Sequence, residues 1–575
     1  MAVSAIVAPL VVGVTSHRNI PAREAEAIRR RVREFFAQLQ HEFPGLPLVV
    51  LSALAAGGDQ WVAEEALAAG AELVAPLPLP PAAYADDFTD AASRVAFAEL
   101  CRRARVLQLP ALSAAGEAAM PGDARDRHYA QAGIYIASHS HILLALWDGR
   151  ESDLLGGTAQ VVRYHLTGVM PGAIERRRGA QALLGRGDES LVYHIVCSRA
   201  GRDGVALPPL PPLQPLQARW LGRERVRAGS DGMPAEFRLM FTRMRQFDED
   251  CQRHAERIRA DAQAPDGTAA QASDDPIDGL FAAADWLARH FQRRVLQALR
   301  SIYVLATLMG IAFVCYSDLP TDLPYQDHAI YVFIVLFGAG VLVDRVARRR
   351  DWYRKYIDYR ALAEGLRVQH WWREAGIAPT SSSGFAHDNF MQKQDIELGW
   401  IRNVMRAASV RTFDDAAPPD AALARIGAEW IGAPGHGGQL DYYTRKSERR
   451  SRTQRLTRGL GRACLWTSIA ISLLLALFQH RIGPDDTTSL VALMGTLTII
   501  AAARESYAYR KGDKELIKQY RYMHGIFAEA RHLLDRVHDA NGRREILRAL
   551  GEAALAEHAE WALMHRERPL ENARF

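Results

Sequence analysis

Four apolar segments dominate the pattern of hydrophobic and polar positions in the second half of the chain. Each lacks charged residues for 15 to 17 positions, at residues 301–317, 329–343, 463–479 and 487–503. A helix needs roughly 20 apolar residues to cross a hydrocarbon core of about 30 Å, so the segments are at the short end of the usable range. Helices of a soluble protein normally keep a stripe of polar residues, and all four segments lack one. The pattern therefore predicts four transmembrane helices.

The charges beside these segments are distributed unevenly. The two short connections, 318–328 and 480–486, carry a single arginine, Arg481. The opposite flanks carry Arg345, Arg348, Arg349, Arg350, Arg354 and Lys355, seven basic residues between positions 445 and 458, and Arg504, Arg510 and Lys511. By the positive-inside rule we expect a multi-pass protein of the inner (cytoplasmic) membrane with both termini cytoplasmic. The formal net charge of +5 then reflects flanks beside lipid headgroups, and no nucleic acid partner is expected.

The membrane half also shows an internal repeat. A shift of about 161 residues places Ser301 on Arg462, Ala329 on Leu490 and Tyr359-Arg360 on Tyr520-Arg521. This register predicts two parallel hairpins, each followed by a cytoplasmic amphipathic helix, although any two hairpins overlay to some extent. The centres of the spans lack acidic and basic residues, which disfavours an ion-coupled carrier. A pore built from several copies and an inert anchor both fit this composition.

The N-terminal half alternates between short apolar runs and longer amphipathic segments. Strands are predicted at 10–14, 48–52, 72–76, 106–109, 141–147 and 191–196, and helices at 22–39, 60–69 and 91–105, with a further helix from Gly156-Gly157-Thr158. We assign residues 5–14 to a strand rather than to a secretion signal because they lack a basic leader and a cleavage site. Continuous apolar strands that alternate with helices predict an α/β domain with a parallel sheet covered on both faces.

Polar and small residues cluster in three loops that follow predicted strands. In such a sheet the ligand binds beyond the carboxyl ends of the strands. Glycines there allow backbone amides to approach an anion, hydroxyls, histidine and arginine contact phosphate, and a carboxylate accepts a ribose hydroxyl. A Gly-Gly pair is also an ordinary turn and a single histidine is commonly structural, so the prediction depends on all three loops together. The candidate ligand-binding residues are Gly13, Thr15, Ser16, His17, Arg18, Ser52, Gly57, Gly58, Asp59, Asp148, Gly156, Gly157 and Thr158.

These loops carry a family resemblance. The segments 12–18, 52–59 and 143–149, with Gly156-Gly157-Thr158-Ala159, resemble the SLOG superfamily, a Rossmann-like group that includes LOG enzymes, DprA proteins and the sensor region of TRPM channels. The resemblance covers about residues 5–200, and the paired spans resemble SLATT-type transmembrane effectors. It implies a cytoplasmic sensor for a nucleotide or ADP-ribose-like ligand, with no further cofactor, in a homo-oligomeric membrane effector of bacterial anti-phage or stress signalling.

One departure from that family concerns catalysis. LOG hydrolases place a catalytic glutamate three residues after the Gly-Thr pair, whereas this chain has Val161 there. Glu64 or Glu65 would have to replace it as the acid or base of N-glycosidic hydrolysis, but both fit an exposed helix face. We therefore expect no catalytic residue. A membrane-anchored nucleotide hydrolase stays an alternative, and a membrane-tethered scaffold is a second one.

The remaining segments complete the predicted organisation. We expect a sensor at 1–200, a proline-rich linker and charged helix at 201–290, the first hairpin with its cytoplasmic helix at 291–375, a connector at 376–444, and the second hairpin with C-terminal helices at 445–575. A charged helix is predicted at 236–260, a mobile segment at 261–275, and two amphipathic helices between 515 and 566. The five cysteines show no metal-ligand spacing, so neither a metal site nor a disulfide framework is expected.

Overall fold

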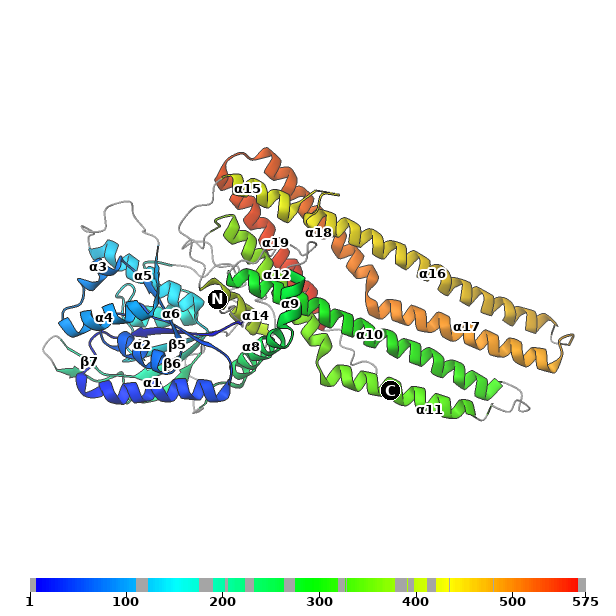
Figure 1. The fold of residues 1–575 in the computed structure, drawn as a ribbon, viewed down its shortest axis with the longest axis horizontal. Helices are drawn as coiled ribbons and strands as arrows, with labels where there is room; N and C mark the ends of the chain where they lie inside the picture. Colours follow the sequence, from blue (N-terminus) through cyan, green and yellow to red (C-terminus); the bar gives the residue numbers. More distant parts are fainter. Residues whose placement is uncertain are drawn as a thin grey trace. The chain divides into compact units, whose positions relative to one another are not determined.

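The chain folds into two compact units, each described here by itself. The computed structural model describes residues 7–109, 122–174, 190–201, 205–222, 232–262, 275–318, 326, 328–377, 390, 398–410, 420–433, 435–478 and 480–566. The sheet unit comprises Met1–Trp286, Ala361–Ala417 and Leu555–Glu567, and the span unit comprises Leu287–Arg360, Pro418–Ala554 and Arg568–Phe575. Figure 1 shows the elements of both units.

A seven-stranded sheet with the order β4-β3-β2-β1-β5-β6-β9 forms the centre of the sheet unit. Its strands are β1 (Leu10–Ser16), β2 (Leu48–Leu51), β3 (Glu72–Leu77), β4 (Arg105–Gln108), β5 (Ile142–Trp147), β6 (Leu191–Val196) and β9 (Ala218–Leu221). The first six pair in parallel, which confirms all six predicted strands. The strands are apolar and buried along most of their length, as expected when helices cover both faces.

The expectation of a wholly parallel sheet is wrong at one edge, where β9 pairs antiparallel with β6. The described chain between them contains only the short strands β7 (Arg199–Ala200) and β8 (Ala206–Leu207), and no helix. A parallel return needs a crossover of a dozen or more residues, usually a helix, so a connection that lacks one favours the antiparallel direction. The sheet consequently extends past residue 200, the predicted end of the sensor.

Helices cover both faces of the sheet. On one face α1 (Ala22–Glu42), α2 (Gly58–Ala68) and α4 (Ala91–Arg103) pack together, and Phe35 of α1 stacks on Tyr193 of β6 with ring centroids 4.4 Å apart. On the other face lie α5 (Gly122–His139) and α6 (Thr158–Thr167), which contact each other. The one-turn helix α3 (Pro81–Ala85) follows β3. The predicted helices are confirmed within a few residues, and α5 was not predicted.

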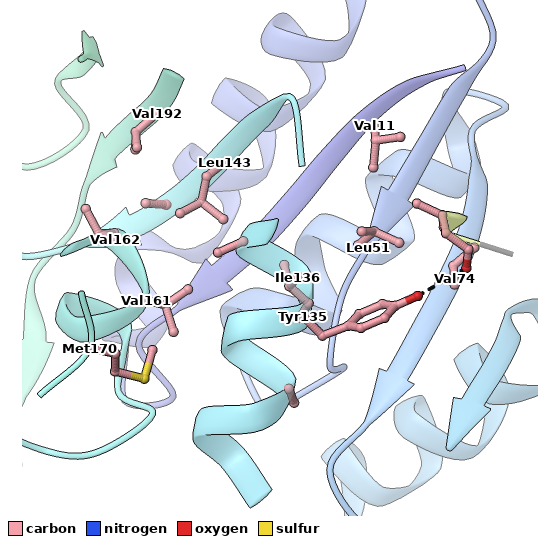
Figure 2. Packing of buried hydrophobic residues seen from close by; sticks show 14 of the residues in the cluster. Val11, Leu51, Val74, Tyr135, Ile136, Leu143, Val161, Val162, Met170 and Val192 are labelled. Carbon is pink, nitrogen blue, oxygen red and sulfur yellow. Dashed lines mark hydrogen bonds between the residues drawn. The ribbon is translucent and has the colours of Figure 1, made fainter. Parts of the chain in front are cut away.

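The face under α5 and α6 holds a hydrophobic core. Figure 2 shows Tyr135 and Ile136 of α5 and Val161 of α6 in the same cluster as the strand residues Val11 and Leu143, with the Tyr135 ring extending toward Val74. The Tyr135 hydroxyl donates a hydrogen bond to the Val410 carbonyl, with 3.2 Å between the oxygens. A segment that follows the first pair of membrane-length helices in sequence thus completes this core.

That segment includes α14 (Gly399–Ser409), which the sequence placed only in a connector. The His141 ring joins it to the sheet, because the Val11 N–H donates to Nδ1 (3.1 Å) and Nε2 lies 2.8 Å from the Asn403 carbonyl. The first bond makes Nδ1 an acceptor, so the proton is on Nε2 and is donated to Asn403. Burial lowers the pKa of His141 to about 3, which keeps the ring neutral.

Further helices pack beside α14 within the sheet unit. The predicted helix 236–260 is divided at His254 into α8 (Ala235–Arg253) and α9 (Ala255–Ala262), and Phe247 of α8 contacts Trp400 of α14 with ring centroids 5.9 Å apart. The expected mobility of 261–275 falls almost wholly outside the described residues. The long α12 (Trp352–Glu374) buries Leu362 and Leu366.

The span unit contains the membrane-length helices. The four are α10 (Pro276–Asp318), α11 (His328–Arg349), α16 (Gly438–Phe478) and α17 (Pro484–Lys511), and each is long and apolar enough to cross a membrane. Large apolar side chains on them, such as Tyr331, Leu342 and Leu477, are more than 60% exposed. Contiguous apolar surface of this extent is not stable in water. The four predicted spans are confirmed as helices of membrane-spanning length and composition, which indicates a membrane protein.

Contacts within the span unit give these helices a lateral order. Ser468 of α16 lies 2.8 Å from the Thr498 hydroxyl of α17. A Cβ atom added to Gly310 of α10 would lie 3.0 Å from Ile499 of α17. Phe313 of α10 contacts Phe333 of α11 with ring centroids 6.1 Å apart. The order is therefore α16, α17, α10, α11.

The membrane-length helices α11 and α17 end in the same way. Asp351, with φ +52°, separates α11 from α12, and Gly512, with φ +65°, separates α17 from α18 (Asp513–Arg536). The last helix is α19 (Ala540–Arg566), so both predicted C-terminal helices are confirmed. Before α16, the helix α15 (Asp420–Ile426) continues into a π-helical turn, η3 (Gly427–Ile431), whose Trp430 contacts Phe527 of α18.

We predict that Gly13→Ala destabilises the sheet unit. A Cβ atom at Gly13 would lie 2.0 Å from the Ser140 hydroxyl and 2.9 Å from the Ile136 side chain, so α5 would have to move. Overpacking of this kind costs about 1–3 kcal/mol. Thermal unfolding of the full-length protein in detergent should show a lower midpoint. Gly525→Ala in α18, which meets no atom within 4 Å, is the control and should not lower it; an equal midpoint for Gly13→Ala and wild type would contradict the packing described.

Candidate functional site

The candidate site lies where the strand order reverses. The strand β1 is central, with β2 on one side and β5 on the other, and the order continues outward from both. At the carboxyl ends of the strands, the chain therefore leaves β1 toward β2 and leaves β5 in the opposite direction, toward β6. In open parallel sheets this position is where ligands bind. The structure brings together here Ser16 at the end of β1, His17 and Arg18 after it, and Asp148 after β5.

A direct contact joins the two loops. The Asp148 N–H donates to His17 Nε2 at 3.2 Å, and the same nitrogen lies 3.1 Å from Oδ1 of Asp148. The Arg150 N–H donates to the same Oδ1 at 3.0 Å. Burial acts to raise the pKa of Asp148, but the hydrogen bonds from His17 and Arg150 outweigh burial and lower it. Asp148 is thus an ionised carboxylate held at the switch point, with a side chain only 2% exposed.

A second contact joins the β1 loop to the start of α2. The Ser16 hydroxyl donates to Oδ1 of Asp59 at 2.7 Å. Asp59 is only 5% exposed, and burial raises its pKa to about 6 although Ser16 and the positive charge of Arg18 act in the opposite direction. Asp59, which with Asp148 was one of the two carboxylates predicted to accept a ribose hydroxyl, is therefore already engaged by Ser16.

The predicted glycines allow parts of the chain to approach each other closely. Gly57 has φ +87°, and a Cβ atom added to it would lie only 2.7 Å from the Arg18 carbonyl oxygen, which is too close. A Cβ atom added to Gly58 would lie 2.7 Å from the Ser16 hydroxyl. At Gly156, with φ +74°, it would lie 2.7 Å from the Ala130 nitrogen, and at Gly157 3.0 Å from the Leu154 carbonyl oxygen. Each glycine thus has a packing role within the chain, which the sequence analysis did not distinguish from ligand approach.

Two helix starts add positive electrostatic potential at this edge. The helix α2 begins at Gly58 after β2, and α6 begins at Thr158 after β5. In neither helix does the N-cap glycine, Gly57 or Gly157, provide a side-chain hydrogen bond. The amides of a first helical turn have no partner within the helix and attract anions. The arrangement therefore suits a ligand that carries negative charge.

Arg18 has an aromatic support that was not predicted. Its guanidinium carbon lies 5.1 Å from the ring centroid of Tyr129 on α5, while the side chain stays exposed. The Tyr129 hydroxyl bonds to Asp87, which also accepts from Arg125 at 2.7 Å. This orients a cation at the switch point without neutralising it by direct pairing with Asp87. No local sequence pattern pointed to Tyr129, because it is more than 100 residues from Arg18.

Other candidates have different surroundings. Gly13 lies under α5 in the sheet interior, and Ser52 is fully buried, with its hydroxyl accepting from the Leu54 N–H at 3.1 Å. Thr15 and Thr158 are each 8% exposed. The structure thus places Gly13 and Ser52 in packing and turn roles.

The substitute catalytic carboxylates take part in ion pairs between α1 and α2. Arg29 lies 2.5 Å from Glu64 and 3.1 Å from Glu65, and Arg33 also pairs with Glu65 at 3.1 Å. Val161, at the place of the LOG glutamate, is 3% exposed and contacts Gly133 in the core. Among the described residues, no group of three His, Cys, Asp or Glu side chains has the geometry of a metal site.

Comparisons with known proteins add no relative. No family model, curated protein or solved structure matches the chain.

We predict that Asp59 makes stability fall as the pH rises through about 6. The ordinary aspartate pKa is 3.8, so between these values the folded state retains a proton that the unfolded state has released. The stabilisation is complete below 3.8 and is lost as the pH rises to about 6, by about 3 kcal/mol at most. Asp59→Asn should flatten the decrease in unfolding midpoint between pH 4.5 and 7, whereas the exposed control Asp153→Asn should leave it unchanged. Identical profiles for Asp59→Asn and wild type would argue against this burial.

Proposed function

We propose that the chain is a membrane effector, with the character of a channel or of a bilayer-perturbing protein, that is gated by a nucleotide-derived ligand. The ligand binds the carboxyl edge of a Rossmann-like, SLOG-type sheet. The observation that carries the proposal is the switch point between β1 and β5, where Arg18 and the starts of α2 and α6 provide positive potential beside the ionised Asp148.

The chemistry of this edge favours a phosphorylated sugar over a neutral metabolite. The guanidinium of Arg18 suits phosphate oxygens, and helix amides suit the same charge. A carboxylate such as Asp148 suits a hydroxyl, so one ligand with both groups satisfies the site. An ADP-ribose-like molecule or another nucleotide has this combination.

Two helices support communication with the membrane. The helix α10 is continuous from Pro276 to Asp318, beginning in the sheet unit and ending in the span unit, and α12 also contributes to both units. The sheet unit is thus connected to the spans through two continuous helices, which is the route we propose for a conformational change. Ligand can shift the conformation only by its different affinity for two states.

The repeat supports an effector with SLATT-like hairpins. Asp351 and Gly512, the two left-handed residues that end α11 and α17, are 161 residues apart, which is the shift expected from sequence. Equivalent hairpins followed by equivalent helices are better suited to a symmetric assembly than to a simple tether. A role in anti-phage or stress signalling rests on the family resemblance alone.

The hydrolase alternative has less support. The core position of Val161 and the ion pairs of Glu64 and Glu65 leave the site without a free general acid or base of the LOG type. The scaffold alternative is favoured by no specific contact.

We predict that full-length protein in detergent is stabilised by ADP-ribose or ATP and that Arg18→Gln weakens this binding. Loss of a charge-assisted bond to phosphate is worth about 1.5–3 kcal/mol, so we expect a Kd at least tenfold higher by titration calorimetry. Ligand binding raises the unfolding midpoint by mass action. Arg102→Gln, an exposed site on α4, is the charge-matched control. Unchanged affinity in Arg18→Gln would show that the ligand binds elsewhere, and product formation would favour the hydrolase.

We predict that the bound ligand increases dye leakage from liposomes containing full-length protein. Ligand that favours an open or perturbing state must increase flux over the ligand-free level. Arg18→Gln should shift the ligand dependence to higher concentration without changing insertion. Leakage that stays constant at saturating ligand would favour the scaffold.

A further inference from the structure

Two glutamines occupy the same position in the two helices that begin at the candidate site. Gln60 is the third residue of α2 and Gln160 is the third residue of α6, and they are 4% and 3% exposed. The Gln60 Nε2 donates hydrogen bonds to the carbonyl oxygens of Ser93 at 3.0 Å and of Leu54 at 3.4 Å. The Gln160 Oε1, by contrast, is enclosed and has no hydrogen-bond partner among the described residues. Of these two equally buried amides, the described chain thus satisfies only the one on α2.

The unpartnered oxygen of Gln160 is costly while no ligand is bound. A buried polar atom that loses its bond to water and gains no other lowers the free energy of unfolding, and native proteins keep few such atoms. The next two residues of α6, Val161 and Val162, are core residues, so an apolar side chain at position 160 would extend a surface that the chain already builds. An amide at this position is explained if a group from outside the chain bonds to it.

The position of Gln160 relates it to the candidate site. Because the Cα–Cβ bonds of a helix tilt toward its N-terminus, the Gln160 side chain leans toward the edge of the sheet where α6 begins. The chain just before α6 also contacts the support of Arg18: a Cβ at Gly156 would lie 3.0 Å from the Tyr129 Cβ, and the Arg18 guanidinium carbon lies 5.1 Å from the Tyr129 ring centroid. Gln160 and Arg18 therefore belong to one edge of the sheet unit, and Tyr129 contacts both of the segments that carry them.

The oxygen of Gln160 requires a hydrogen-bond donor, which decides the chemistry of its partner. Phosphate oxygens, which suit Arg18 and the amides at the start of α6, only accept, whereas a hydroxyl donates and accepts. Asp59 and Asp148, the two carboxylates predicted to accept a ribose hydroxyl, already accept hydrogen bonds within the chain. We propose that Gln160 binds a ribose hydroxyl of the nucleotide-derived ligand and so makes the site selective for ribose over deoxyribose, an inference that rests on the proposed function.

Titration calorimetry of the full-length protein in detergent with ATP and 2′,3′-dideoxy-ATP tests this contact. Gln160→Met keeps the length of the side chain and removes the amide, and we expect it to raise the Kd of ATP about threefold to tenfold, the effect of one lost neutral hydrogen bond. Wild type should prefer ATP over the dideoxy analogue, and Gln160→Met should lose this preference, because each change removes the same bond. Without ligand, Gln160→Met should raise the unfolding midpoint, whereas the matched control Gln60→Met should lower it, because the Ser93 and Leu54 carbonyls lose their donor.

The preference for the ribose hydroxyls decides the outcome. The proposal is overturned if Gln160→Met discriminates between the two nucleotides as strongly as wild type does. If Arg18→Gln still weakens ATP binding in that case, the proposed function stands and only the role of Gln160 is lost. A lower midpoint for Gln160→Met without ligand, together with unchanged discrimination, would identify a bound water as the partner of the amide and also overturns the proposal. If wild type binds ADP-ribose but not ATP, Gln160→Met must weaken ADP-ribose binding by the same factor, and an unchanged Kd overturns the proposal. Binding of neither nucleotide to wild type overturns the proposed function and this proposal together.

Discussion

Apolar surface that cannot face water is the constraint on which the architecture depends. In the sheet unit this surface is covered by the chain itself, since strand residues such as Val12 and Leu144 are fully buried between helices. In the span unit the same kind of side chain remains open, and α11 and α17 contain no buried residue at all. Hydrocarbon is the solvent that accepts these side chains, and it also requires every backbone group to bond internally. Helices satisfy that requirement, which is why this half of the chain contains no strand among its described residues.

The candidate site arises from a different constraint, the direction of parallel strands. Because β1 is central and the order reverses there, polar loops from distant parts of the sequence meet at one edge. Contacts within the protein then hold these loops: His17 bonds to Asp148, Ser16 bonds to Asp59, and Arg18 packs on Tyr129. Such contacts fix the orientations of these side chains within the chain itself.

Two helices have residues in both units and so connect the units covalently. Both α10 and α12 pass from one unit to the other without a break in the helix, and α14 returns the chain to the core of the sheet unit after the first hairpin. The Tyr135–Val410 and His141–Asn403 hydrogen bonds fasten that return. The sheet unit is therefore not an N-terminal module that ends before the membrane half begins. Its core includes residues that follow two spans in the sequence, so the sheet unit completes its core only with chain that lies beyond the first hairpin.

The sequence by itself determined the elements whose pattern is local. Apolar length predicted the four membrane helices, continuous apolar runs predicted six strands, and the 161-residue shift predicted the register that Asp351 and Gly512 display. Only the tertiary structure decided the antiparallel β9, the insertion of α14 into the core, the packing roles of Gly13 and Ser52, and the support of Arg18 by Tyr129. The physical reason is distance along the chain. The periodicity of a segment shows which of its faces is buried and which faces solvent. It does not show which distant segment covers the buried face, because that depends on the packing of the whole unit.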